Sequence, residues 1–379
     1  MSENYFRIDI FSTFASLLKT EHLNSIMAQW YKNRIQRETG EWVDAQFPII
    51  VSASRSTDIP AFYADWFFHR LKIGYSAWTN PFNGVKSFVS YKHTRFIVFW
   101  SKNPKQLLQH LDYLQERKIN CYIQYTLNDY VAERLENGVP SVEERIDTFK
   151  QLVAKLGKGR VIWRFDPLIL TDKITIENLL AKIENIGNQL VGYTEKLVFS
   201  FADITTYKKV KVNLEKNYIN YLEWTENQMN EFAEKLQCLN KKWKFELATC
   251  GEKIDISKYE IMHNHCVDDN LMIRFAYKDK ILMDFLGVEI HNNTHSLFGD
   301  EPIPDNAIIL NSNQYAVKKK DNKDKGQRQF CGCMVSKDIG EYNTCPHLCE
   351  YCYANASKEV AVKNFNLHKL NKFGETIKG

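Results

Sequence analysis

The sequence predicts an α/β fold, a TIM-like (β/α) barrel that is either closed or short of a strand. Seven short apolar runs, each rich in β-branched or aromatic residues, alternate with longer stretches of helical periodicity. Unbroken apolar runs are typical of strands buried on both faces in a parallel sheet. The runs cover residues 47–54, 74–78, 95–100, 119–126, 160–165, 196–201 and 244–249. An eighth strand has two candidate positions, 262–267 and 271–276, and an open doubly wound sheet is the alternative.

The barrel is expected at residues 47–286, between two segments of different character. Before it, apolar residues from Ile10 to Trp30 recur at helical spacing, so residues 1–46 are interpreted as a helical extension. After it, residues 287–379 form a C-terminal segment in which the periodicity fades and five of the nine cysteines crowd together. The chain is therefore divided into an extension, a barrel and a cysteine-rich C-terminal segment.

Composition and charge set broad limits on the class of protein. Of the 379 residues 44% are hydrophobic and 25% are charged, and the net charge of +4 neither requires nor excludes nucleic acid. No stretch approaches the about 20 apolar residues of a membrane span, and the N-terminus lacks the pattern of a secretory signal. An odd number of cysteines favours a reducing compartment. We expect a cytoplasmic protein without membrane contact, and the sequence does not predict its oligomeric state.

Polar residues stand where the predicted strands end. Active sites of (β/α) barrels lie at the carboxyl ends of the strands, so these side chains are expected at one mouth. The candidates for catalysis are Arg55, Asp58, Lys102, Arg164, Asp166 and Glu246, and the candidates for cofactor binding are Asn80, Gln124 and Ser200. Charges of both signs suit a ligand with a carboxylate, an amine and polar rings, such as S-adenosylmethionine (SAM), or a phosphorylated metabolite. Helix capping or ion pairing is the alternative for Asp58, Asn103 and Asp166.

Three closely spaced cysteines near the C-terminus carry the strongest chemical signal. The segment reads Cys345-Pro-His-Leu-Cys349-Glu-Tyr351-Cys352. Three thiolates on one short loop can hold three irons of a 4Fe–4S cluster and leave the fourth iron open to a small molecule. The spacing therefore predicts an open-site iron–sulfur cluster.

Two further cysteines, Cys331 and Cys333, leave two alternatives for this loop. One is a closed cluster in which either of them is the fourth ligand, and the other is a tetrahedral zinc site that they form with Cys349 and Cys352. The remaining cysteines are scattered and are interpreted as small core residues: Cys121, Cys238, Cys250 and Cys266.

Several motifs together resemble one uncharacterised bacterial family. They are SASRSTDIPAFYADWFF (52–68), WTNPFN (78–83), FWSKNP (99–104), VIWRFDP (161–167), LVFSFAD (197–203) and CGCMVSKDIGEYNTCPHLCEYCYAN (331–355). The family is a domain of unknown function whose cysteine tail is similar to the cluster loop of radical SAM enzymes. Some members carry labels that liken them to spore photoproduct lyase, a DNA repair photolyase.

The resemblance implies a cofactor, partners and a reaction. By this resemblance Cys345, Cys349 and Cys352 hold a 4Fe–4S cluster, with Tyr351 beside the cofactor. SAM would bind the open iron and be split to a 5′-deoxyadenosyl radical after receiving one electron. The implied partners are SAM, an electron donor and a nucleic acid or nucleotide as substrate.

Two features depart from the usual radical SAM pattern. The cysteine loop follows the last predicted strand instead of the first, although a circularly permuted arrangement would still bring it over the barrel mouth. The Gly-Gly-Glu segment that often binds SAM is absent, and residues 248–252 resemble it only weakly.

We therefore expect a radical SAM-like enzyme, with two alternatives from other classes. One is a non-catalytic protein that binds nucleic acid or acts as a sensor and whose cysteine site is structural. The other is a barrel hydrolase or lyase in which Asp166 and Glu246 act as acid and base and the cysteine tail is only a lid.

Overall fold

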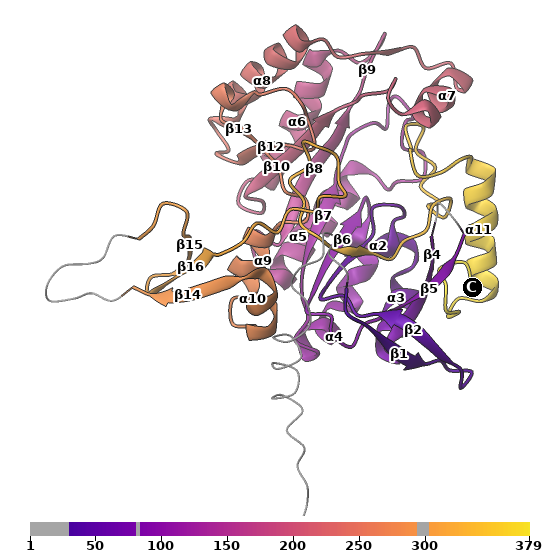
Figure 1. The fold of residues 1–379 in the computed structure, drawn as a ribbon. Helices are drawn as coiled ribbons and strands as arrows, with labels where there is room; N and C mark the ends of the chain where they lie inside the picture. The colour runs from indigo at the N-terminus through magenta and orange to yellow at the C-terminus, as the bar shows by residue number, and fades with distance from the viewer. Residues whose placement is uncertain (1–29, 81–83, 294–302) are drawn as a thin grey trace, which may run out of the picture.

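A computed structural model describes residues 30–80, 84–293 and 303–379, and its central feature is an eight-stranded sheet (Figure 1). Neighbouring strands in this sheet are all parallel. In spatial order they are β17 (Lys337–Asp338), β3 (Ile50–Ala53), β6 (Phe96–Ser101), β7 (Asn120–Thr126), β8 (Val161–Leu168), β10 (Lys196–Phe201), β12 (Glu246–Thr249) and β13 (Ile261–His263). From β3 to β13 the strands lie side by side in chain order. That is the order of a singly wound barrel and not of a doubly wound sheet.

Strand pairing does not close this sheet into a barrel within the described residues. The two edge strands, β13 and β17, are not hydrogen-bonded to each other. The segments beside them meet where the Met334 N–H donates to the Val267 carbonyl at 2.9 Å. The predicted α/β class and parallel sheet are confirmed. A closed barrel is not detected in the part of the chain that the structure describes.

Both faces of the sheet are buried, as the unbroken apolar runs predict. On β6, Ile97 and Phe99 pack into one apolar cluster, and the alternate residues Phe96 and Val98 pack into a second cluster on the other face. All four side chains are fully buried. This alternation directs Trp100, the next residue in the second series, to the inner face of the curved sheet.

Helices follow most strands, and most of them cover the outer face of the sheet, while the two that follow β13 pack into the second, inner cluster (Figure 1). They are α2 (Ile59–Phe62), α3 (Ala64–Ile73), α4 (Leu111–Glu116), α5 (Val142–Leu156), α6 (Ile176–Leu190), α7 (Lys208–Lys216), α8 (Glu226–Asn240), α9 (Asp269–Ala276), α10 (Lys280–Leu286) and α11 (Lys358–Leu370), with short 3-10 helices at Pro104–Gln109 and Ser257–Tyr259. The Ser141 hydroxyl caps α5, and capping boxes begin α6 at Thr175 and α8 at Thr225. None of the described helices has both the length and the apolar character needed to cross a bilayer.

Two strand predictions need correction. The run at 74–78 is β4 (Tyr75–Thr79), which lies outside the main sheet because it pairs antiparallel with β5 (Lys86–Ser90). The segment 271–276, a candidate for the eighth strand, lies in helix α9, whereas 262–267 overlaps β13. The apolar run at 74–78 does not reveal its partner, since apolarity reports burial and not pairing.

The N-terminal extension is not helical where it is described. Residues 32–46 form a hairpin of β1 (Lys32–Gln36) and β2 (Trp42–Gln46), and β2 pairs in parallel with β5. The hairpin turns at Gly40, whose φ of +87° is one that glycine adopts without strain. Residues 1–29, which carry most of the helical periodicity, lie outside the described residues.

The C-terminal segment has three parts. A small sheet of β14 (Val288–Asn292), β16 (Gln314–Lys318) and β15 (Ile308–Asn311) projects from the molecule (Figure 1). The chain then returns to the main sheet as β17 and continues into the cysteine loop. Helix α11 is the last helix, and it packs where α2 meets α3. There the Phe365 ring contacts the rings of Phe62 and Tyr63. A minor two-stranded ladder joins β9 (Leu170–Thr171) to β11 (Tyr221–Leu222).

Candidate functional site

Strand β17 delivers the cysteine loop to the carboxyl edge of the sheet. It is parallel to β3, so the residues after both strands emerge at the same edge. Asp338 at the end of β17 accepts hydrogen bonds from the Ser54 hydroxyl (2.7 Å) and the Arg55 N–H (2.8 Å). Gly340 permits this contact, because a Cβ there would lie 1.9 Å from the Ser54 hydroxyl oxygen. The loop is thereby held beside the end of β3.

This loop gathers Cys345, Cys349 and Cys352 in one largely buried place. Each thiol lies near enough to the other two to influence their ionisation. Burial raises the pKa of all three thiols, that of Cys345 to about 12. Buried thiols of this kind become thiolates when they bind a cationic metal centre. The structure therefore brings together the three cysteines that the sequence singles out.

Backbone N–H groups point at two of these sulfurs. The N–H groups of His347 and Asp58 act to lower the pKa of Cys345, and those of Asn355 and Ala354 act to lower the pKa of Cys352. N–H groups aimed at ligand sulfurs are a common means of tuning an iron–sulfur cluster. The buried thiols and their donors therefore fit such a cluster.

Lys102, directly after β6, places a positive charge beside the thiols. Its Nζ lies 2.6 Å from the Glu136 carboxylate and 2.8 Å from the Tyr351 hydroxyl. Burial acts to lower the pKa of Lys102, but Glu136 and the Cys349 thiol outweigh it and the pKa is raised. Lys102 therefore stays charged, and its charge offsets part of the rise in the pKa of Cys349.

Asn128, one of the polar residues expected after the fourth predicted strand, and Glu136, which the sequence reasoning missed, complete a buried network. Asn128 Nδ2 donates to the Glu136 carboxylate at 3.0 Å and to the Tyr351 hydroxyl at 3.1 Å. Burial acts to raise the pKa of Glu136, but Lys102 and Arg145 lower it to about 2. Tyr351, predicted to contact a cofactor, also bonds its hydroxyl to Glu136. Both residues lie on the loop between β7 and α5, and no periodicity marks Glu136 there.

Asp58 is a capping and positioning residue, which was the alternative interpretation of this position. Its carboxylate accepts from the Ala61 N–H at the start of α2 and from the Ser101 hydroxyl. The second oxygen accepts from the Lys102 N–H at 2.7 Å and lies 2.8 Å from His347 Nε2. Asp58 thus ties β6 and the cysteine loop together. Asn103, by contrast, makes no side-chain cap.

Four predicted residues converge at the middle of the carboxyl edge. Arg164 and Asp166, both on β8, form an ion pair, and the Ser200 hydroxyl on β10 also donates to Asp166. Gln124 on β7 accepts from Arg164 Nη1 at 3.2 Å. All four are on alternate positions that face the inner side of the sheet, so the predicted convergence of strand-borne residues is correct here.

Trp100 lies between two arginines at the same edge. The guanidinium carbons of Arg55 and Arg164 are 5.5 and 5.4 Å from the centre of its ring. Nη2 of Arg55 is buried and has no hydrogen-bond partner. A buried donor without a partner is costly, so an anionic group that reached Arg55 would be bound favourably.

Two predicted residues lie away from this edge. Glu246 is the first residue of β12, and its largely exposed carboxylate pairs with Lys196, the first residue of β10, at 2.8 Å. Asn80 follows β4, outside the main sheet, and its N–H donates to the Val85 carbonyl. Glu246 is therefore at the opposite edge of the sheet from Asp166. The two cannot act together as acid and base, and the hydrolase or lyase hypothesis is wrong in that form.

The region that holds these residues matches a known sequence family. Residues 50–354 match a family described as a domain of unknown function, DUF1848. The chain belongs to this family. No curated protein matches the chain. The DUF1848 region begins at β3 and ends just beyond Cys352, so it contains the parallel sheet and the cysteine loop but neither the β1–β2 hairpin nor α11.

The DUF1848 region also contains a second gathering of cysteines. The sulfurs of Cys250 and Cys266 are 3.1 Å apart, and the thiols of Cys331 and Cys333 lie near enough to each other and to Cys266 to shift one another's pKa. Cys331 and Cys333 thus lie with two cysteines that were interpreted as core residues. The contacts described give no support to their joining Cys349 and Cys352 in one closed cluster or zinc site.

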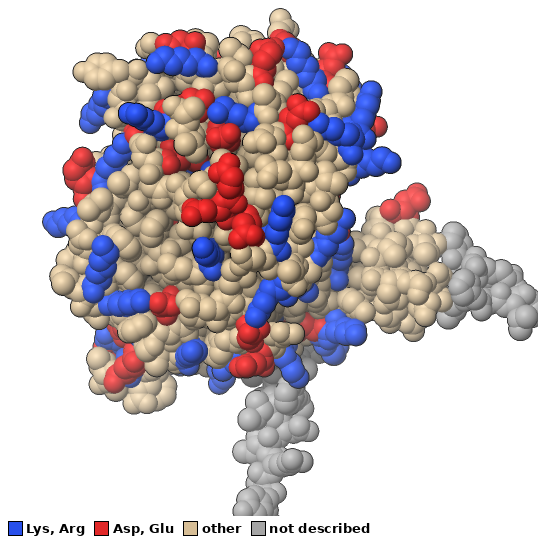
Figure 2. All heavy atoms as spheres, turned by 180° about the vertical axis from the view of Figure 1, so that it is seen from behind, with Lys and Arg blue, Asp and Glu red and all other residues tan. Residues whose placement is uncertain are grey.

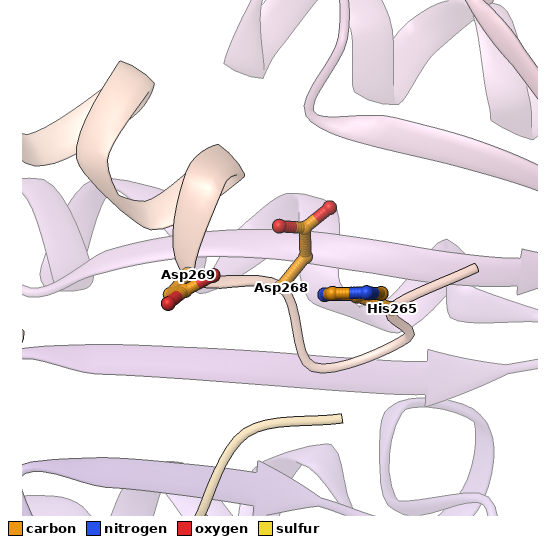
Figure 3. Close-up of side chains that lie close together, drawn as sticks. All are labelled: His265, Asp268 and Asp269. Carbon is orange, nitrogen blue, oxygen red and sulfur yellow. The ribbon is translucent and has the colours of Figure 1, made fainter. Parts of the chain in front are cut away.

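One further group of potential metal ligands is accounted for by local structure. Figure 3 shows His265, Asp268 and Asp269 on the DUF1848 segment that leads into α9. Asp268 caps α9 by accepting from two backbone N–H groups, and Asp269 pairs with Lys318 at 3.1 Å. The two carboxylates are therefore already used as a helix cap and an ion-pair partner.

Proposed function

We propose that the protein is a radical SAM-like iron–sulfur enzyme that holds a 4Fe–4S cluster on Cys345, Cys349 and Cys352. The observation that carries this proposal is the gathering of these three thiols, with N–H donors, at the carboxyl edge of a parallel sheet. The carboxyl edge is where singly wound α/β folds carry their chemistry. When bound, such a cluster supplies the electron that splits SAM into methionine and a 5′-deoxyadenosyl radical.

The strand order supports this assignment despite the late position of the motif in the sequence. β17 precedes the cysteine loop and lies beside β3, so in spatial order the loop follows the first strand of the sheet. This is the circularly permuted arrangement that would reconcile a C-terminal loop with the usual radical SAM pattern. The chain order is changed, while the place of the loop relative to the sheet is kept.

The residues that converge at the carboxyl edge of the sheet suit the binding of SAM. The unpartnered Nη2 of Arg55 is a donor for a carboxylate, and the Asp166 carboxylate is an acceptor for an amine. Trp100 offers an aromatic ring at the same place. In this proposal Gln124 and Ser200 act as positioning residues that orient Arg164 and Asp166.

A nucleotide or nucleic acid remains our proposal for the substrate, with a separate protein as electron donor. On the face in Figure 2, basic and acidic side chains are interspersed, with several acidic ones near the centre. This face offers no broad electrostatic footprint for a duplex, so a nucleotide or a short single strand suits it better than a long duplex.

Anaerobic reconstitution with iron and sulfide tests the proposed activity. We expect about four irons per chain on this loop, a paramagnetic resonance spectrum that changes when SAM is added, and 5′-deoxyadenosine after reduction. Cys349→Ala should abolish the product, while Cys238→Ala, an exposed cysteine outside both groups, should not. A loaded cluster that ignores SAM would overturn the proposal and favour the non-catalytic binding or sensing protein.

A further inference from the structure

We propose that Cys250, Cys266, Cys331 and Cys333 form a second metal site, a tetrathiolate centre separate from the Cys345 loop. This inference does not rest on the proposed function. The four thiols come from three segments that are distant in sequence: the turn after β12, the turn after β13, and the strand-like stretch before β17. The last two segments flank the two edge strands of the open sheet.

Contacts between the segments bring the sulfurs together. The sulfurs of Cys250 and Cys266 are 3.1 Å apart, and the Cys333 thiol lies near enough to those of Cys266 and Cys331 for the three to shift one another's pKa. The backbone supports this arrangement, because the Val267 N–H donates to the Cys333 sulfur at 3.4 Å. The four thiols are therefore successive neighbours in the order Cys250, Cys266, Cys333 and Cys331, and a bound metal would draw them into a tetrahedron.

Cys266, Cys331 and Cys333 lie in the inner apolar cluster and Cys250 packs against it, but polar and charged donors also reach this group. Arg164 Nη1 and Asn264 Nδ2 donate to the Cys266 sulfur at 3.0 and 3.1 Å. Arg55 and Arg328 add positive charge beside Cys331 and Cys333. Thiolates bound to a metal carry net negative charge, which buried guanidinium and amide donors stabilise.

Two glycines make room for these contacts. A Cβ on Gly251 would lie 2.7 Å from the Arg328 guanidinium, and Gly251 has a φ of +72°. A Cβ on Gly332 would lie 2.3 Å from the His265 ring. The Cys-Gly-Cys stretch can therefore approach the segment after β13 because Gly332 has no side chain.

Cys121 shows what a core cysteine looks like in the same protein. It is buried in the apolar cluster under the helices, and no other thiol acts on it. Four thiols in one polar, arginine-lined place are better explained by a thiophilic metal, since four-sulfur sites select zinc or an iron–sulfur cluster. A simple Cys250–Cys266 disulfide is the competing explanation, and it would leave Cys331 and Cys333 without a role.

Metal analysis of the full chain, produced without oxygen, tests the site. The triple variant Cys345→Ser, Cys349→Ser, Cys352→Ser removes the first group and leaves the second intact. We expect it to retain about one zinc ion or one iron–sulfur cluster per chain. Adding Cys266→Ser and Cys333→Ser should reduce that metal at least ten-fold, whereas adding Cys238→Ser should not. Zinc and iron with sulfide are measured separately, so either metal supports the site.

A triple variant that folds, by circular dichroism, but holds no metal would overturn the proposal. So would a disulfide between Cys250 and Cys266 in protein kept free of oxygen. If the triple variant does not fold, alkylation of the wild-type protein decides: the four thiols should resist the reagent until the metal is chelated. Ready alkylation before chelation contradicts the site, and neither result depends on whether SAM is cleaved.

Discussion

Glu136 is the residue on which the charges around the cysteine loop depend. It is buried, and its carboxylate faces Lys102 at 2.6 Å and Arg145 at 3.7 Å. The two cations hold its pKa at about 2 despite a burial that acts in the opposite direction. Its charge in turn keeps Lys102 protonated beside the Cys349 thiol. The Glu136 carboxylate therefore influences the electrostatic potential at the candidate cluster site, because it keeps Lys102 charged beside Cys349.

We predict that Glu136→Gln removes part of the acid dependence of stability. A carboxylate whose pKa falls on folding stabilises the protein above its unfolded pKa, here near 4.5. That stabilisation is lost as the pH falls from 4.5 towards 2, and the shift corresponds to about 3 kcal/mol. Urea unfolding at a series of pH values should show the largest difference between wild type and variant near pH 7. A constant difference across the range would contradict this, and Glu143→Gln, on the exposed face of α5, is the control.

We also predict that Lys102→Met destabilises the protein more than the double variant Lys102→Met, Glu136→Gln. The single change leaves the buried carboxylate with one cation, the more distant Arg145, and the loss of a partner from a buried ion pair typically costs about 3 kcal/mol or more. The double change removes both charges and should recover much of that loss. Urea unfolding of the four proteins gives the coupling energy of the pair. Additive effects of the two changes would show that Lys102 and Glu136 are not coupled.

At the residue scale, the sequence indicates strand-borne site residues better than loop-borne ones. Gln124, Arg164 and Ser200 follow from the two-residue alternation of a strand. The prediction for Glu246 is wrong, because this residue lies in the first half of the predicted strand 244–249 and is the first residue of β12, at the amino edge. Glu136 has no such pattern, since a loop residue is positioned only by its tertiary contacts.

At the element scale, β17 is the shortest strand of the main sheet and the one that positions the cysteine loop. It has only two residues, Lys337 and Asp338, too few for any periodicity to reveal. Its place depends on Asp338, whose carboxylate also accepts from the Gly340 N–H at 3.0 Å. Hydrogen bonds to the Asp338 side chain thus hold β17 in place, whereas longer backbone ladders hold the other strands of the sheet.

We predict that Gly340→Ala displaces the loop and lowers iron incorporation several-fold. The new Cβ would meet the Ser54 hydroxyl oxygen at 1.9 Å, inside a contact that Ser54 and Asp338 already fill. Gly326→Ala is the matched control, because its Cβ would meet only the Asp324 carboxylate at 3.2 Å. Iron per chain after identical reconstitution is the measurement. Equal iron in both variants would mean that the loop does not need this contact.

The β4–β5 and β1–β2 hairpins mark the limit of prediction at the element scale. The 74–78 run is a strand as predicted, but the helix before it ends at Gly74 and the chain turns back into a hairpin instead of the main sheet. The apolar spacing before residue 32 predicts a helix that continues through 32–46, whereas the exposed strands found there show little apolar alternation. The local sequence pattern can predict that a segment is a strand, but the strand with which it pairs depends on the rest of the chain.

At the scale of the whole molecule, the C-terminal segment returns to the main sheet and pairs with β3. The sequence predicts a parallel sheet and its helices, because each strand signals its own burial. It does not predict that residues near 337 return to the edge of β3, since that contact spans nearly the whole DUF1848 region. The two cysteine groups lie at the two ends of this return, one before β17 and one after it. Metal at the group that includes Cys250 and Cys266 would therefore fasten the C-terminal segment to the sheet, whereas metal at the Cys345 loop would order that loop itself.

We predict that removal of metal loosens this return and leaves the centre of the sheet intact. Thiolate–metal bonds contribute folding free energy only to the segments that they join. Hydrogen–deuterium exchange, followed by mass spectrometry, should become faster in peptides covering 261–267 and 331–357 after chelation or oxidation of the metal. Peptides from β7 and β8 should be unchanged, because both lie within the sheet and are buried on both faces. Faster exchange throughout the molecule would instead mean that the metal supports the whole fold, and no change would mean that packing alone holds the return in place.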